Sequence, residues 1–383
     1  YWAHPPVYMP ENCNLADVEH IKNFVDIPVI CAGRLDPKVA AKSVAEGKID
    51  GAGFARQFLA DPEWVTKMCD GRDDDIRPCI LCHNGCFNMC HYKGVPNDQD
   101  LSDSLHLARC AVNAEMMQWN KHYIKKTANP KTVHIIGGGI GGMEAARVLK
   151  LRGHNPVIHE KSDRLGGTFI PASAESYKGK LRDLLKWYIR QMEILGIEVK
   201  YNDEVTDVSV FGKAPVIVAT GAAPRQLRRV SGYEKMIEAC DFLNGKEVGE
   251  TVAVIGGGLT GSEIAYELAL KGKKPIIVEM KDDLVSQKGV CLANSSYLRE
   301  WFALNKVPVY LETSLKEVKD GSIVCTTKDG DIEIACDSVI SCAGYIPAPI
   351  SEKKGNVYLV GDCLAVGNLR SVVWRAYEVA MKI

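Results

Sequence analysis

Residues 133–142 read Val-His-Ile-Ile-Gly-Gly-Gly-Ile-Gly-Gly, and this stretch decides the fold of the chain. An apolar run leads into a G-x-G-x-x-G pattern formed by Gly137, Gly139 and Gly142, and a helical pattern follows. In a dinucleotide-binding unit these glycines allow the tight turn, the approach of pyrophosphate, and the packing of helix on strand. The pyrophosphate lies at the helix N-terminus, where free amides and the helix dipole favour anions. Glu160 ends the next apolar run and is placed to accept hydrogen bonds from ribose hydroxyls.

The same unit recurs at an offset of 119 residues. Residues 252–261 read Val-Ala-Val-Ile-Gly-Gly-Gly-Leu-Thr-Gly, which places Gly256, Gly258 and Gly261 at the positions of the first triplet. Glu279 again ends the following apolar run. Two such units predict two bound nucleotides. Glu279 favours NADH over NADPH, because a carboxylate at this position repels the additional phosphate.

Two further apolar runs end in turns that can face a bound nucleotide. Residues 216–221 predict a buried strand that leads to a Thr220-Gly221 turn. Residues 357–362 predict a strand that ends at Gly361-Asp362, where the carboxylate can bind a sugar or polyol hydroxyl.

Five of the 14 cysteines lie within a short segment before these units. Cys79, Cys82 and Cys86 are spaced x2 and x3, Cys90 follows, and Cys110 comes after a long interval. Several cysteines in one short run are typical of iron–sulfur clusters. Zinc is an alternative, although its structural sites usually take two separated pairs of ligands. A run of buried or incidental cysteines is the third interpretation.

Residues 1–75 alternate helical and strand-like runs in the manner of a βα barrel. They hold two βα units, a quarter of an eight-fold barrel, so we expect a fragment whose earlier barrel strands precede Tyr1.

The loops after the two strand-like runs contain Gly33-Arg34 and Ala55-Arg56. The loops after the last two strands of such barrels commonly bind phosphate, and each loop here offers backbone amides and one cation. The alternative is that either arginine pairs with a surface carboxylate.

The composition excludes several classes of partner. A net charge of -1 over 383 residues gives no basic surface for nucleic acid and no polybasic patch for a membrane. No apolar run approaches the roughly 20 residues of a membrane-spanning helix. Because disulfide-dense scaffolds are small, the clustered cysteines of this long chain indicate metal binding in a reducing, cytoplasmic compartment.

The two glycine-rich units resemble the two-dinucleotide-binding fold of flavoprotein disulfide reductases. Residues 161–167 (Lys-Ser-Asp-Arg-Leu-Gly-Gly), the Thr220-Gly221 turn and the Gly361-Asp362 ending match its FAD-binding half. No C-x-x-C or C-x4-C pair follows the first unit, which argues against thiol–disulfide chemistry. The resemblance implies FAD contacts at Gly137, Gly139, Gly142, Glu160, Thr220, Gly221, Gly361 and Asp362, and NAD contacts at Gly256, Gly258, Gly261 and Glu279.

A barrel end, a cysteine segment and a FAD/NAD module, in this order, resemble the iron–sulfur flavoenzymes of the old yellow enzyme superfamily. This group includes 2-enoate reductase, 2,4-dienoyl-CoA reductase, the bile-acid-inducible NADH:flavin oxidoreductases and trimethylamine dehydrogenase. The resemblance implies FMN in the barrel and a 4Fe–4S cluster bound by Cys79, Cys82, Cys86 and Cys110. The interval before Cys110 is longer than in dienoyl-CoA reductase, which leaves Cys90 as an alternative ligand.

The expected fold is therefore α/β: the C-terminal end of a TIM-type FMN barrel, a 4Fe–4S linker, and a Rossmann-like module for FAD and NAD. The expected boundaries are 1–75 for the FMN-binding barrel part, 76–131 for the cluster segment and connector, 132–247 with 336–383 for the FAD-binding domain, and 248–335 for the nested NAD-binding domain.

The implied activity is the NADH-dependent reduction of an activated C=C bond. Hydride transfer requires NADH to touch its flavin, so electrons are expected to pass from NADH to FAD, the 4Fe–4S cluster, FMN and the substrate. His4 follows Trp2 in a segment that resembles a loop lining the FMN site of dienoyl-CoA reductases, and it is the candidate catalytic residue. The alternative is a surface histidine, and other acids would precede Tyr1. His83, next to Cys82, is interpreted as a solvated side chain rather than one that approaches the cluster.

Residues 361–376 resemble the 2-enoate reductase and bile-acid-inducible branch, so the expected partner is a small-molecule α,β-unsaturated carboxylate. A bile-acid or steroid enone, a 2,4-dienoyl-CoA, and an electron-transfer NADH:flavin oxidoreductase subunit without its own substrate pocket are the alternatives. An amine dehydrogenase is disfavoured, because such enzymes export electrons and need no working NADH site. The oligomeric state stays open, a homo-oligomer included.

Overall fold

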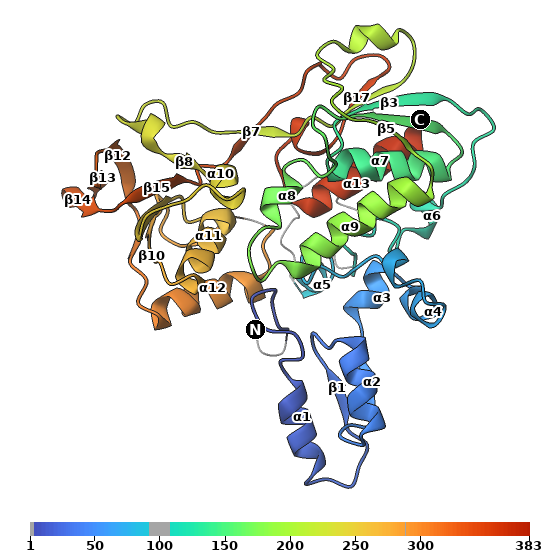
Figure 1. Ribbon diagram of the computed structural model, residues 1–383, viewed down its shortest axis with the longest axis horizontal. Helices are drawn as coiled ribbons and strands as arrows, with labels where there is room; N and C mark the ends of the chain where they lie inside the picture. The colour runs from blue at the N-terminus through green and yellow to red at the C-terminus, as the bar shows by residue number, and fades with distance from the viewer. Residues whose placement is uncertain (1–3, 92–107, 288) are drawn as a thin grey trace.

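Two parallel sheets organise the computed structural model, which describes residues 4–91, 108–287 and 289–383 (Figure 1). The first has the strand order β17-β6-β3-β4-β5 and the second the order β11-β10-β9-β15-β8. The strands of the first sheet are β3 (Thr132–Ile136), β4 (Asn155–His159), β5 (Glu198–Lys200), β6 (Val216–Val218) and β17 (Val357–Leu359). Those of the second are β8 (Ile237–Glu238), β9 (Thr251–Ile255), β10 (Lys274–Val278), β11 (Val309–Tyr310) and β15 (Ser338–Ser341).

The chain crosses between the two sheets twice. It leaves the first sheet after β6 and enters the second at β8, then returns from β15 to finish with β17. An antiparallel pair lies on the two crossings, formed by β7 (Ala222–Pro224) and β16 (Tyr345–Pro347). The first sheet is therefore built from segments on both sides of the second in sequence.

Helices cover these sheets through apolar faces. On the first sheet, α7 (Ile140–Leu151) packs against α9 (Gly179–Ile194) and α13 (Leu369–Lys382). Trp374 and Tyr377 of α13 are buried in the core cluster that also contains Ile135 of β3. The second sheet carries α10 (Ala239–Leu243), α11 (Leu259–Leu270) and α12 (Leu292–Leu304). The repeated βαβ unit thus forms the centre of both sheets.

A small antiparallel sheet extends from the second parallel sheet at the left of Figure 1. Its strands are β12 (Ser314–Val318), β13 (Ser322–Thr327) and β14 (Gly330–Ala335). Val318, Ile323 and Ile334 turn inward to a core shared with Val278 of β10.

The N-terminal segment projects away from both sheets at the bottom of Figure 1. It consists of α1 (Leu15–Lys22), β1 (Ile30–Ala32), α2 (Pro37–Ala45) and β2 (Gly51–Gly53), and β1 pairs with β2 in parallel. Helix α2 begins sharply because Asp36 accepts hydrogen bonds from the amides of Lys38 and Val39, both at 2.9 Å.

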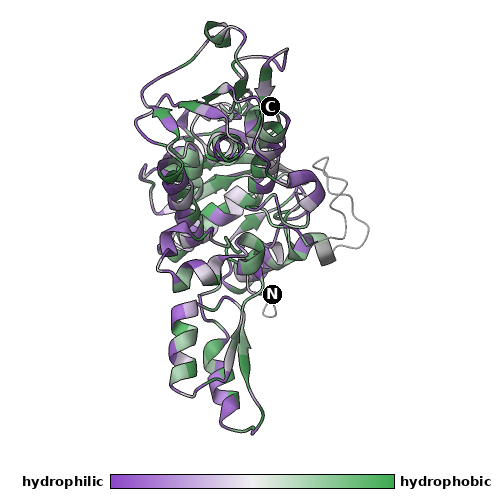
Figure 2. Cartoon of the chain, turned by 90° about the vertical axis from the view of Figure 1, so that its right-hand side faces the viewer, coloured by the Kyte–Doolittle hydropathy of each residue, from purple (hydrophilic) through white to green (hydrophobic). Residues whose placement is uncertain are grey.

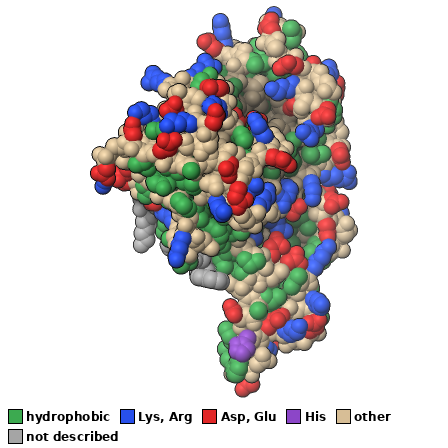
Figure 3. Space-filling view, turned by 60° about the vertical axis from the view of Figure 1, so that its left-hand side comes forward, with side chains coloured by type: hydrophobic (Ala, Val, Ile, Leu, Met, Phe, Trp, Pro, Cys, Tyr) green, Lys and Arg blue, Asp and Glu red, His purple; other side chains and the backbone are tan. Residues whose placement is uncertain are grey.

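Several large apolar side chains of this segment face solvent. Phe24 is 73% exposed, Ile27 68% and Ile30 65%. Figure 2 shows hydrophobic residues along the projecting segment, and Figure 3 shows hydrophobic side chains exposed near its tip. A parallel two-stranded sheet with an uncovered apolar face is incomplete by the usual rules of α/β architecture.

Short elements connect the segment to the first sheet. They are α3 (Arg56–Ala60), α4 (Trp64–Cys69), a 3-10 turn at Asp73–Asp75, α5 (Phe87–His91) and α6 (Trp119–His122). Other short elements lie after the first strand of that sheet: α8 (Phe169–Ala172) and the 3-10 turns at Val208–Phe211, Tyr233–Lys235 and Gly361–Cys363. Within the described ranges, no helix has the length and apolar character needed to cross a lipid bilayer.

Candidate cofactor-binding sites

The glycine-rich turn between β3 and α7 forms an open cradle. Gly137 has φ +107°, and a Cβ on Gly142 would lie 2.0 Å from the Gly137 oxygen, so only glycine fits this crossing. Gly139 precedes α7, and a Cβ placed on it would have no neighbouring atom within 4 Å. No side chain caps the amides at the start of α7. An open space before free helix amides fits a pyrophosphate group.

The other residues predicted to contact FAD gather around this turn. Glu160 follows β4, and its Oε2 accepts a hydrogen bond of 2.7 Å from the amide of Gly138. The amide of Thr220 lies 3.5 Å from a Cβ placed on Gly137. Gly361 also lies close to the start of α7, because its Cα is 3.9 Å from a Cβ placed on Gly141.

The turn residues on the far side of this site are held by backbone contacts. Thr220 Oγ1 donates a hydrogen bond of 2.7 Å to the Ala348 oxygen, and Gly221 has φ +75°. Asp362 Oδ1 accepts one of 3.0 Å from the Gly367 amide, and burial raises the pKa of its carboxyl. The structure therefore places all eight residues predicted for FAD near the carboxyl ends of β3, β4, β6 and β17, with Gly142 in the first turn of α7 and the other seven in the connecting loops and turns.

The turn between β9 and α11 repeats this geometry. Gly256 has φ +108°, and a Cβ on Gly261 would lie 1.8 Å from the Gly256 oxygen. A Cβ on Gly258 would meet only the Gln287 amide, at 3.6 Å or more. Glu279 Oε2 accepts a hydrogen bond of 2.6 Å from the Gly257 amide, as Glu160 does in the first unit. The second cradle therefore also fits a pyrophosphate.

The loops after β1 and β2 open into one cavity of about 1090 Å³. Arg34 Nη1 donates a hydrogen bond of 2.5 Å to the Pro6 oxygen, and burial lowers the pKa of the Arg34 guanidinium. Arg56 Nη1 lies 2.6 Å from His83 Nε2. Within the described residues, neither arginine forms an ion pair with a carboxylate within 4.0 Å. The lining includes Gly33, Arg34, Ala55 and Arg56, and the two cations fit the phosphate of FMN.

Two histidines border this cavity, and one differs from its interpretation. His4 is exposed, lines the cavity and lies against Phe87, with ring centroids 3.9 Å apart. Its catalytic role stays a prediction, and Trp2 lies outside the described residues. His83 is only 2% exposed, so its interpretation as a solvated side chain is wrong. Burial, and then the nearby Arg56, lower the pKa of His83 to about 3.

The four predicted cluster cysteines converge between the projecting segment and the first sheet. Burial raises the pKa of the Cys86 thiol to about 11 and that of the Cys110 thiol to about 12. Burial raises the pKa of Cys82 further, and Cys86, Cys79 and Cys110 all add to this shift. Four partly buried thiols that influence each other fit the donor set of a cubane, in which each thiolate binds a different iron.

The described residues offer no group of three His, Cys, Asp or Glu that could hold a single metal ion. This does not favour a mononuclear zinc site. The side chain of Cys90 lies outside the described part of the chain, so its role as an alternative ligand stays a prediction.

The long-range contact to Cys110 depends on a glycine and a tryptophan. A Cβ on Gly85 would lie 2.8 Å from the Ala111 amide, so the loop between Cys82 and Cys86 presses directly on the backbone after Cys110. Trp374 Nε1 of α13 donates a hydrogen bond of 2.9 Å to the Cys110 oxygen. Neither residue was expected, because such contacts between distant segments leave no pattern in a single sequence.

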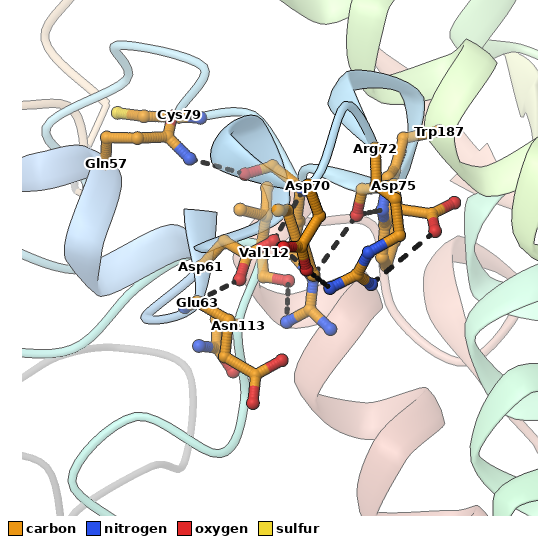
Figure 4. A network of polar contacts seen from close by, with 12 residues as sticks. Gln57, Asp61, Glu63, Asp70, Arg72, Asp75, Cys79, Val112, Asn113 and Trp187 are labelled. Carbon is orange, nitrogen blue, oxygen red and sulfur yellow. Dashed lines mark hydrogen bonds and ion pairs between the residues drawn. The ribbon is translucent and has the colours of Figure 1, made fainter. Parts of the chain in front are cut away.

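Polar side chains of the projecting segment and its connection hold the cysteine segment (Figure 4). The Gln57 amide bridges two backbone groups: it accepts 2.8 Å from the Cys79 amide and donates 2.8 Å to the Arg77 oxygen. Asn113 Nδ2 donates 3.0 Å to the Leu59 oxygen, and Trp187 Nε1 of α9 donates 3.0 Å to the Asp75 oxygen. Asn113 follows Cys110 by three residues, in the sequence Cys110-Ala-Val-Asn113.

Residues 131–357 match the pyridine nucleotide-disulphide oxidoreductase family. The chain belongs to this family. Residues 1–75 match the NADH:flavin oxidoreductase / NADH oxidase family. This combination places the oxidoreductase in the iron–sulfur flavoenzyme branch of the old-yellow-enzyme-like proteins, whose cofactors are FAD, FMN, NADH and a 4Fe–4S cluster.

Named relatives of this oxidoreductase cover nearly all of the chain. A cinnamate reductase of Clostridium sporogenes is 36% identical over 393 residues, which span 100% of this chain and 57% of that protein. An NADH oxidase of Thermoanaerobacter brockii is 32% identical over 95% of this chain and 57% of that protein. A solved 2-naphthoyl-CoA reductase in complex with 2-naphthoyl-CoA has a TM-score of 0.85 and 27% identity, over 99% of this chain and 57% of that one. The chain therefore spans a little over half the length of the proteins it resembles.

Proposed function

We propose that this chain is part of an NADH-dependent reductase of an activated C=C bond, similar to 2-enoate reductase. The observation that carries the proposal is that four partly buried thiols lie close to one another beside the cavity of Arg34 and Arg56, in a chain that also has two open glycine-rich turns. The similarity to a cinnamate reductase over the whole chain favours an α,β-unsaturated carboxylate as substrate.

Three separate groups of residues in this chain would bind the three nucleotides FAD, NADH and FMN. The amides at the start of α7 would hold the pyrophosphate of FAD, with Glu160 on the ribose and Asp362 on the polyol chain. The turn at Gly258 and the Glu279 carboxylate would hold NADH in the same way. Arg34 and Arg56 would hold the phosphate of FMN.

The bound groups supply the electron chemistry, in the order NADH, FAD, 4Fe–4S, FMN and substrate. The protein separates the site of hydride entry from the site of substrate reduction, and Cys79, Cys82, Cys86 and Cys110 lie between them. His4, exposed at the cavity, is placed to polarise a substrate carbonyl or to assist protonation at Cα. The thiolates must remain reduced to bind iron, which supports a reducing compartment such as the cytoplasm.

Anaerobic turnover of the full-length protein tests the proposal. NADH should be consumed only when an enoate such as cinnamate is present, and the saturated acid should form in equal amount. The same preparation should contain about four irons and four sulfides per chain, as expected for a cubane. Stoichiometric zinc without sulfide, or NADH consumption that leaves every enoate unchanged, would contradict it.

An acyl-CoA thioester is the second candidate substrate, because of the similarity to 2-naphthoyl-CoA reductase over 99% of the chain. Turnover of cinnamoyl-CoA but not cinnamate would select it. Bile-acid or steroid enones and 2,4-dienoyl-CoA belong in the same substrate panel. Reduction of an added carrier protein with no substrate turned over would instead indicate an electron-transfer subunit.

A further inference from the structure

The first turn of α13 contains a buried cation near the cysteine segment. Arg370 is 1% exposed and stands one residue after the start of the helix. Two effects disfavour a cation at this position: burial removes its hydration, and the positive end of the helix dipole repels it. The helix start is fixed by a capping box, in which Asn368 Oδ1 accepts 3.2 Å from the Ser371 amide. A neighbouring negative charge offsets such costs.

The four thiolates of a bound cluster would provide such a charge. Burial lowers the pKa of Arg370 to about 10, and the charge of Cys82 acts in the opposite direction. Arg370 thus remains protonated at neutral pH.

A tryptophan positions Arg370 next to a second buried arginine. The Arg370 Cζ lies 5.4 Å from the centroid of the Trp374 ring, and the Arg109 Cζ lies 3.9 Å from the same centroid. Arg109 is also 1% exposed and directly precedes Cys110. Trp374 in turn donates its indole hydrogen bond to the Cys110 oxygen. The indole face attracts both guanidinium groups, and its hydrogen bond ties the stack to the backbone of Cys110.

We propose that this stack of Arg370, Trp374 and Arg109 raises the reduction potential of the cluster bound by the four cysteines. The inference rests on the proposed function, because it requires a bound 4Fe–4S cluster. A cubane with four thiolates is negatively charged and gains one more negative charge on reduction. The potential of such a cluster depends on nearby charge and burial, so a buried cation favours the reduced form. Arg370, Trp374 and Arg109 are therefore positioning residues that make the cluster a better electron acceptor.

Redox titration of the cluster in the full-length holoprotein, followed by EPR, tests this. Arg370→Gln should lower the midpoint potential by about 59 mV or more, a tenfold smaller ratio of reduced to oxidised cluster at a given potential. Arg370→Lys should restore most of the loss, because it keeps the charge. Lys382→Gln is the matched control, since it removes an exposed charge from the last turn of the same helix and should leave the potential unchanged.

Equal potentials in wild type and Arg370→Gln would overturn the inference, and so would a drop of the same size in Lys382→Gln. If Arg370→Gln loses its cluster, Arg109→Gln becomes the deciding variant: a lowered potential supports the inference and an unchanged one overturns it. Wild-type protein without iron would contradict the proposed function itself, a result separate from an iron-loaded protein with unchanged potentials.

Discussion

At the scale of single residues, the close approach of Gly142 to Gly137 sets the strictest local requirement for glycine. A Cβ on Gly142 would lie 2.0 Å from the Gly137 oxygen, a backbone atom that cannot move aside. We predict that Gly142→Ala destabilises the protein by about 1–3 kcal/mol or more and loses FAD. Thermal unfolding and the flavin absorbance of the purified protein would measure both effects. Gly179→Ala is the control, because its Cβ would have only an ordinary contact at 3.8 Å; equal behaviour of the two variants would contradict the prediction.

The second prediction at the scale of single residues concerns Glu279. Its carboxylate is oriented by the amides of Gly257 and Lys281, at 2.6 and 2.8 Å, and would face the adenosine ribose. Glu279→Arg should shift the preference from NADH toward NADPH by roughly 5–150-fold, since repulsion of one charge amounts to about 1–3 kcal/mol. The ratio of kcat/KM for the two nucleotides measures this, and Glu279→Gln should give an intermediate value. A wild-type protein that uses both equally well would show that Glu279 has another role.

At the scale of elements, a buried ion network joins the two parallel sheets and the projecting segment. Lys178, just before α9, lies 2.9 Å from Glu175 Oε1 and 2.8 Å from Glu263 Oε2 of α11. Tyr8 of the N-terminal segment donates 2.9 Å to the other oxygen of Glu263. Burial raises the pKa of the Glu175 carboxyl, and the positive charge of Lys178 acts to lower it.

Breaking this network by one partner should be costly. Lys178→Met would leave two buried carboxylates without their cation, and we predict a loss of about 3–5 kcal/mol in the free energy of unfolding. Lys274→Met is the control: it removes an ion pair with Glu250 in which the two side chains are 71% and 58% exposed, so its loss should cost about 0–1 kcal/mol. Denaturant unfolding measures both, and similar midpoints would show that the network does not hold the sheets together.

Whether a feature could be predicted from the sequence depends on how far apart in the chain its interacting residues lie. The two glycine turns depend on neighbours a few residues apart, so the pattern at 137–142 and its repeat were enough to place them. The contact of Arg56 with His83 and that of Trp374 with Cys110 join segments 27 and 264 residues apart. Their formation depends on how whole elements pack, and a single sequence holds no signal of that packing. His83 was misjudged for this reason.

At the scale of the whole molecule, the cysteine segment lies between the projecting FMN-type segment and the first sheet. We predict that Cys82→Ala separates the two flavin reactions: FAD should still be reduced by NADH, FMN should stay oxidised, and enoate reduction should stop. Rapid-mixing spectra of the full-length protein with both flavins bound would show this split. Wild-type rates of FMN reduction in the variant would overturn the electron order. Cys325→Ala, which alters a buried thiol in β13, is the control.

The crossings between the two sheets also set an order of events during biosynthesis. The second sheet is complete once β15 has left the ribosome, whereas the first sheet waits for β17 and α13. Because Trp374 and Arg370 come from α13, the walls around Cys110 and Cys82 close only after that helix has been made. Domains generally fold as units during synthesis, so the nascent NAD-type sheet forms before the metal pocket exists. The iron–sulfur assembly machinery would therefore meet a chain whose NAD-type sheet is already folded, and cluster insertion would be a late step of maturation.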